Sequence, residues 1–142
     1  MRILLVNGPN LGTLGRRQPE IYGTMTLAEI VDAARAHALD RGSRLDDFQS
    51  NHEGDLIDRL ERLDYDGLIG NFGALSHTSY ALHDALLATG RPAVEVHISD
   101  VMAREPWRRV LVTAPATRHQ VIGRGWRGYL EAIDWLLDDA GP

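Results

Sequence analysis

Two pairs of side chains in this chain of 142 residues have the types and spacing that acid–base chemistry requires. The first pair is Tyr22 and Arg17, in a stretch dense in Gly, Pro and Asn, which is the composition of a loop. A tyrosine hydroxyl is ordinarily protonated at neutral pH, but a guanidinium a few ångströms away favours the phenolate. The pair could therefore supply a general base. The alternative is that Tyr22 is only a packing residue.

The second pair is Glu95 and His97, within an apolar run that is typical of a buried strand. Residues two apart in a strand point to the same face, so this carboxylate can orient the imidazole and raise its basicity. A structural ion pair in the core is the alternative. We favour a functional pair, because two polar residues in a buried strand are costly unless they are satisfied.

The elements that must position these residues alternate along the chain. Apolar runs predict strands, amphipathic runs predict helices, and their alternation indicates parallel pairing with right-handed crossovers. We predict a single α/β domain over residues 1–142, a flavodoxin-like three-layer sandwich with a five-stranded parallel sheet of order 2-1-3-4-5. The predicted strands are Ile3–Val6, Leu45–Gln49, Gly67–Asn71, Ala93–Ile98 and Val110–Thr113; the predicted helices are Leu27–Arg41, Asp55–Leu63, Thr78–Ala88 and Tyr129–Leu137, with a short helical turn around Ala103–Arg108.

Polar residues follow the predicted strands where each one ends. Asn7, the segment Gln49 to Glu53, Asn71 and the segment His97 to Ser99 all stand at such ends. Ligands of open parallel sheets bind at the carboxyl edge, so these residues predict a binding site there. The helix after the third strand would begin with Ser76 or Thr78 as its N-cap.

Composition excludes several classes of function. The basic residues number 15 and all are arginine, which rules out a lysine Schiff base and a P-loop. There is no cysteine, hence no thiol nucleophile. The net charge of −5 and the absence of a basic stripe argue against nucleic acid. No leader segment or membrane span stands out, so we expect a cytoplasmic protein with a small-molecule substrate.

Cofactor and metal motifs are weak or absent. Gly123–Gly128 matches G-x-G-x-x-G, but it lies too close to the end of the chain for a dinucleotide fold. The first loop is poor for a flavin phosphate, because Pro9 removes one amide and Thr13 is the sole hydroxyl. The histidine spacings do not predict a metal site. We expect surface or structural roles for His37, His83 and His119.

Taken together, the motifs of the chain resemble one family, the type II 3-dehydroquinate dehydratases. The resemblance covers nearly the whole chain, in the order of the family. It rests on the segments Asn7–Gly12, Arg17–Gly23, Gln49–Gly54, Gly73–Ser79, Ala85-Leu86, Val94–Ser99, Ala103–Glu105 and Gly128–Ala132.

This resemblance implies a flavodoxin-like subunit in a dodecamer, a homo-oligomer built as a tetramer of trimers. It implies dehydration of 3-dehydroquinate to 3-dehydroshikimate through an enolate, with no cofactor. Tyr22 would remove the C2 proton, and Arg17, on a mobile lid, would keep Tyr22 ionised. Asn10 would hold a water on the enolate. His97, oriented by Glu95, would protonate the departing hydroxyl.

The resemblance also implies the substrate contacts. These would be Asn71 and the amides of Ile98 and Ser99 to the carboxylate region, His77 and Arg108 to the ring hydroxyls, and Asp84 from a neighbouring subunit.

Departures from the family pattern cluster between Asp100 and Ala114. Asp100 replaces the usual Asn, and a second negative charge ~4–6 Å from a substrate carboxylate would cost about 1 kcal/mol in a wet site. Met102, Pro106-Trp107 and Val110–Ala114 also differ. Two alternatives follow: a paralogue that dehydrates a related cyclic polyol acid, and a non-catalytic module that binds a flavin or small acid.

Overall fold

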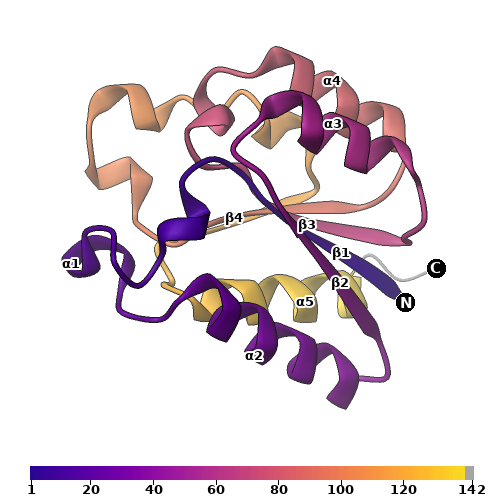
Figure 1. The fold of residues 1–142 in the computed structure, drawn as a ribbon. Coiled ribbons are helices and arrows are strands. Elements are labelled where there is room, and N and C mark those ends of the chain that lie inside the picture. The colour runs from indigo at the N-terminus through magenta and orange to yellow at the C-terminus, as the bar shows by residue number, and fades with distance from the viewer. Residues whose placement is uncertain (140–142) are drawn as a thin grey trace.

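The computed structural model describes residues 1–139, which form a five-stranded parallel sheet of order β2-β1-β3-β4-β5 (Figure 1). The predicted fold class and strand order are confirmed. The strands are β1 (Arg2–Asn7), β2 (Arg44–Gln49), β3 (Gly67–Asn71), β4 (Ala93–His97) and β5 (His119–Ile122). The helices are α1 (Pro19–Tyr22), α2 (Leu27–Asp40), α3 (Glu53–Glu61), α4 (Tyr80–Thr89) and α5 (Arg127–Asp139).

Two hydrophobic clusters cover the two faces of the sheet, with α2 and α5 on one side and α3 and α4 on the other (Figure 1). Side chains of β1 alternate between them: Ile3 and Leu5 pack toward α2 and α5, whereas Leu4 and Val6 pack toward α3 and α4. This alternation follows from the pleat of a strand. Because the helices cover the two faces of the sheet, the edge formed by the carboxyl ends of the strands remains available for a site.

The predicted fifth strand at Val110–Thr113 is wrong. Those residues form an irregular segment, and β5 is His119–Ile122, which pairs with β4 from Val94–His119 to His97–Ile122. The β-branched run was misleading because Val110 is exposed and the Val112 N–H donates to the Ser76 carbonyl rather than to a strand. The true edge strand contains two polar residues and lacks a continuous apolar run.

The helix boundaries differ from prediction at one place that matters for the site. α4 begins at Tyr80 with Ser79 as its N-cap, because the Ser79 hydroxyl accepts the Leu82 N–H. The predicted caps Ser76 and Thr78 are therefore wrong, and Ser76 lies in a 3₁₀ turn (Gly73–His77). The helical turn expected near Ala103–Arg108 is present as two 3₁₀ turns, Val101–Ala103 and Pro106–Arg109. Among residues 1–139, no helix has the length and apolar character of a membrane span.

Candidate active site

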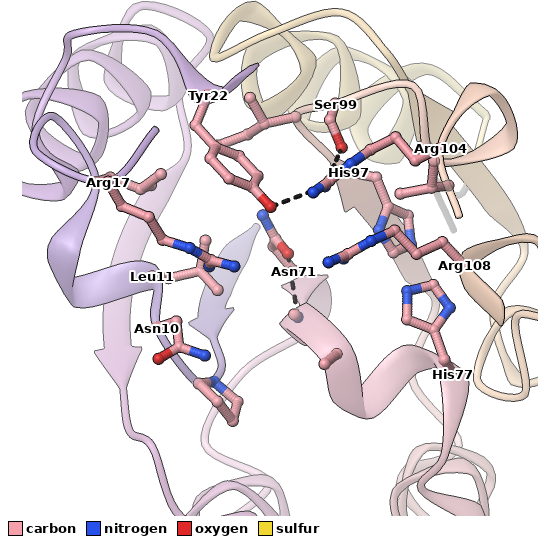
Figure 2. Close-up of a pocket in the computed structure, with 16 residues that line it drawn as sticks. Asn10, Leu11, Arg17, Tyr22, Asn71, His77, His97, Ser99, Arg104 and Arg108 are labelled. Carbon is pink, nitrogen blue, oxygen red and sulfur yellow. Dashed lines mark hydrogen bonds between the residues drawn. The ribbon is translucent and has the colours of Figure 1, made fainter. Parts of the chain in front are cut away.

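A cavity opens at the carboxyl edge of β1, β3 and β4 (Figure 2). Nine of the eleven residues expected in the site line it: Asn10, Arg17, Tyr22, Asn71, His77, His97, Ile98, Ser99 and Arg108. Glu95 is fully buried behind His97. Asp84 lies on α4 beside His83, with an exposed side chain that does not line this cavity.

Tyr22 lies at the end of α1, between two guanidinium groups. Arg17 has its Cζ 4.8 Å from the centroid of the Tyr22 ring, as the sequence pairing predicted. Arg104 donates from Nη1 to the Tyr22 hydroxyl oxygen at 2.8 Å and to Ser99 Oγ at 3.2 Å (Figure 2). Two guanidinium groups thus lie against the ring and the hydroxyl of Tyr22. The sequence analysis assigned Arg104 no role, although Arg104 lies in the segment Ala103–Glu105 that carries part of the family resemblance.

His97 and Glu95 form the expected pair at the end of β4. The His97 Nε2 lies 3.0 Å from Glu95 Oε2, and both side chains are almost completely buried. An ionised carboxylate accepts hydrogen bonds and cannot donate one, so the Nε2 atom carries the hydrogen. The other ring nitrogen, Nδ1, is left to exchange a proton with a bound ligand. This is the geometry of a general acid whose tautomer is fixed by a carboxylate.

Asn71 presents a donor to the cavity because its neighbours fix its amide. The Gly73 N–H donates to Asn71 Oδ1 at 3.2 Å, which places the amide nitrogen on the opposite side. That nitrogen donates to the Tyr129 hydroxyl at 3.0 Å, and Tyr129 in turn donates to Asn7 Oδ1 at 2.6 Å. The second N–H of Asn71 therefore suits an acceptor such as a carboxylate oxygen.

Asn10 lies in the loop after β1 with a left-handed φ of 71°, a conformation that Asn adopts more readily than most residues. Its N–H donates to Asn51 Oδ1 at 3.0 Å, which anchors this part of the loop to the segment after β2. Gly8, two residues earlier, must be glycine because a Cβ there would lie 2.6 Å from the Phe72 carbonyl oxygen. The loop thus brings Asn10 against the cavity.

His77 contributes an acceptor to the cavity. Burial is the main cause that lowers the pKa of His77 below its ordinary value, opposed by the Val110 carbonyl. The Nδ1 atom lies 2.8 Å from that carbonyl and must donate to it, so Nε2 of the neutral ring is an acceptor. The Trp107 ring packs edge-on to His77 at 5.3 Å, and Arg108 Cζ lies 4.1 Å from the centroid of Trp107.

The lowered pKa of His77 makes stability depend on pH. Because the unfolded chain binds this proton more readily, the free energy of unfolding falls as the pH drops below ~6.5, the ordinary pKa of histidine. We expect a lower urea midpoint at about pH 5 than at about pH 7. His77→Asn, which keeps a donor for the Val110 carbonyl but does not titrate, should reduce that difference. An equal reduction in His83→Asn would show that the effect is not specific to His77.

Asp100 does not occupy the position that its sequence context suggested. Its Oδ1 atom accepts the Met102 N–H at 3.1 Å and caps the turn that follows, and Asp100 does not line the cavity. The cost that its charge would impose on a substrate carboxylate stays a prediction, which the substitution described below tests. Among the described residues that line the cavity, none is acidic, whereas Arg17, Arg104 and Arg108 are all cationic. This charge balance suits an anionic ligand.

Because Asp100 caps a turn, we expect its replacement by Asn to have little effect on activity. We expect Asp100→Asn to change kcat/KM less than about twofold, because an Asn side chain caps the Met102 amide equally well. Steady-state kinetics against a carboxylate substrate measure this. A tenfold gain in kcat/KM would show that the Asp100 charge does reach the ligand.

The described residues contain no group of three or more His, Cys, Asp or Glu side chains that could hold a metal ion. The cavity instead combines a tyrosine flanked by cations, a histidine fixed by a carboxylate, and neutral donors and acceptors. Its side chains can move protons on either side of a small anion.

Fold and site together define a flavodoxin-like α/β enzyme with acid–base groups at the carboxyl edge of its sheet. The chain belongs to the dehydroquinase class II family, since the model of that family matches residues 1–137.

The chain is 52% identical to a 3-dehydroquinate dehydratase of Roseiflexus castenholzii, and the match covers 99% of this chain and 91% of that one. It is 48% identical to the catabolic 3-dehydroquinase 1 of Aspergillus terreus, with 93% and 88% covered. A crystal structure of a type II dehydroquinase from Butyrivibrio crossotus superposes with a TM-score of 0.95 at 39% identity, covering 97% and 98%. The predicted family resemblance is confirmed.

Proposed function

We propose that this protein converts 3-dehydroquinate to 3-dehydroshikimate and water through an enolate, with Tyr22 as base and His97 as acid. One observation carries the proposal: the same cavity holds a tyrosine between two guanidinium groups and a histidine bonded to a buried carboxylate. Such an elimination needs both a base and an acid, because a proton leaves carbon and a hydroxyl group must depart.

The proposed steps balance without a cofactor. The Tyr22 phenolate takes the C2 proton and becomes the neutral phenol, and the C2 electron pair moves into the C3 ketone to give an enolate. The enolate then collapses to form the C1–C2 double bond. The C1 hydroxyl leaves as water with a proton from His97. Tyr22 then releases its proton to solvent and His97 takes one up, so both groups return to their starting states. Asn10 would hold a water against the enolate oxygen, as the family resemblance implies.

The substrate carboxylate would be held by neutral donors. The second N–H of Asn71 and the amides of Ile98 and Ser99 belong to residues that line the cavity, at the end of β3 and directly after β4. The acceptor Nε2 of His77 and the guanidinium of Arg108 would contact ring hydroxyls. Arg108 is held by Glu105, which accepts from its Nε atom, so its orientation is set before a ligand arrives.

The direct test is to mix purified protein with 3-dehydroquinate and record the ultraviolet absorbance of the conjugated enone. A steady rise in absorbance, absent with heat-inactivated protein, is the expected result. A folded oligomer that gives no rise would overturn the proposal. Activity with a related cyclic polyol acid but not with 3-dehydroquinate would support the paralogue alternative instead.

We also propose that the subunits form a homo-dodecamer in which Asp84 reaches a neighbouring subunit's site. The support is the outer face of α4, where Tyr80 and Leu87 are 71% and 57% exposed on the same side as Asp84. Light scattering should give a mass near twelve 15.8 kDa subunits. A monomeric mass would contradict the assembly, and with it the role of Asp84.

A further inference from the structure

Residues 110–113 form a segment, here called the strap, that ties together three parts of the site. The Val110 carbonyl accepts from His77 Nδ1 at 2.8 Å. The Val112 N–H donates to the Ser76 carbonyl at 2.7 Å. Thr113 then enters the core, where it is fully buried. The strap therefore has a fixed path along the 3₁₀ turn that follows β3.

Thr113 meets Glu95 at the end of the strap. Its hydroxyl donates to Glu95 Oε1, since an ionised carboxylate can only accept. The second donor to the same oxygen is Ser76 Oγ at 3.4 Å, a long and weak hydrogen bond. The other oxygen, Oε2, receives the His97 Nε2–H at 3.0 Å. The two oxygens of this buried carboxylate thus have different and complementary partners.

We propose that Thr113 is the positioning residue of the catalytic acid, acting on His97 through Glu95. A carboxylate can rotate about its Cγ–Cδ bond, and a buried one turns toward whatever donors remain. The Thr113 hydroxyl holds Oε1 and so keeps Oε2 directed at His97 Nε2. The imidazole is thereby kept in the tautomer with hydrogen on Nε2, which leaves Nδ1 for proton exchange with a ligand. The role in turnover rests on the proposed function; the effect on the His97 tautomer does not.

The kinetic test compares Thr113→Val, which keeps the shape but lacks the hydroxyl, with Thr113→Ser, which keeps the hydroxyl. Loss of a hydrogen bond to a charged group should lower kcat with 3-dehydroquinate by roughly tenfold or more in Thr113→Val. KM should change little, because Thr113 does not line the cavity. Thr113→Ser should recover kcat to within about threefold of the parent. Equal kcat in the parent and the Val variant would overturn the proposal.

A second measurement needs no turnover. With ¹⁵N-labelled histidine, the ring of His97 in the parent protein should give the shifts of one tautomer, protonated at Nε2 and slow to exchange with water. Thr113→Ser should keep that pattern, and Thr113→Val should show mixed tautomers or rapid exchange. An unchanged His97 spectrum in Thr113→Val would refute the positioning role even if the dehydroquinate assay had already failed.

A third variant covers the case in which Thr113→Val does not fold. Thr113→Cys keeps the size and offers a weaker S–H donor to Glu95, so it should fall between Ser and Val in both kcat and tautomer purity. Its thiol would be unique, because the chain has no cysteine. A Cys variant indistinguishable from the parent in both measurements would count against the proposal.

Discussion

Tyr22→Phe is expected to lower kcat for 3-dehydroquinate by about 10³-fold or more, because it removes the oxygen that we propose takes the C2 proton. The ring stays in place, so its stacking against Arg17 is retained and binding of a product or substrate analogue should persist. Steady-state kinetics together with calorimetric titration separate these effects. The expected pattern is a loss of kcat with a dissociation constant that changes little.

Tyr65→Phe is the matched control for this substitution. The Tyr65 hydroxyl is buried in the opposite cluster and donates to the Leu60 carbonyl at 2.7 Å, far from the cavity lining. Its loss should destabilise the fold by about 1 kcal/mol and leave kcat unchanged. If Tyr22→Phe retained more than about a tenth of the parent kcat, Tyr22 would not be the base.

His97→Asn should lower kcat for dehydration by about 10²- to 10⁴-fold, a loss comparable to that of Tyr22→Phe but with a different cause. The proposed acid for the departing hydroxyl is gone, whereas the proposed base, Tyr22, and its neighbours Arg17 and Arg104 are intact, so enolate formation should persist. In D₂O, this variant should therefore exchange the C2 hydrogen of 3-dehydroquinate without making product. Proton NMR follows the loss of the C2 signal directly.

The same exchange measurement distinguishes the two roles. Tyr22→Phe should show neither exchange nor product, because no enolate forms. His119→Asn is the control for His97→Asn, since the His119 ring stacks on Trp135 at the edge strand and does not line the cavity. Its kcat should match the parent. Failure of His97→Asn to exchange C2 hydrogen would mean that His97 takes part in the first step as well.

Strong periodic signals made the fold predictable from the sequence. The runs that became β1 and β3 are apolar apart from their ends, and β4 is apolar apart from Glu95 and His97, because strands in the middle of a parallel sheet are buried on both faces. β5 pairs on one edge only, and it consists of two polar residues followed by two apolar ones, so it lacks that signal. The β-branched Val110–Thr113 has high strand propensity, but its hydrogen bonds go to Ser76 and Glu95 rather than to a neighbouring strand.

The site was predictable where two functional residues lie close in sequence. Glu95 with His97 and Arg17 with Tyr22 are local pairs, and strand alternation or a short loop places them together. Arg104 meets Tyr22 across 82 positions, and Thr113 meets Glu95 across 18. Spacing along the chain cannot reveal contacts of that kind. The first depends on how the connections after β1 and β4 fold against each other, and the second on how the connection after β4 returns to that strand.

The hydrogen bond from Tyr129 to Asn7 joins residues 122 positions apart, and Tyr129 also receives the Asn71 amide. Tyr129 belongs to α5, the last helix of the described chain. During synthesis, the residues of β1, β3 and β4 are therefore in place well before Tyr129, the partner that helps to fix the orientation of the Asn71 side-chain amide. The Asn71 side chain therefore lacks this partner until residues 127–139 have been synthesised and have packed against the sheet.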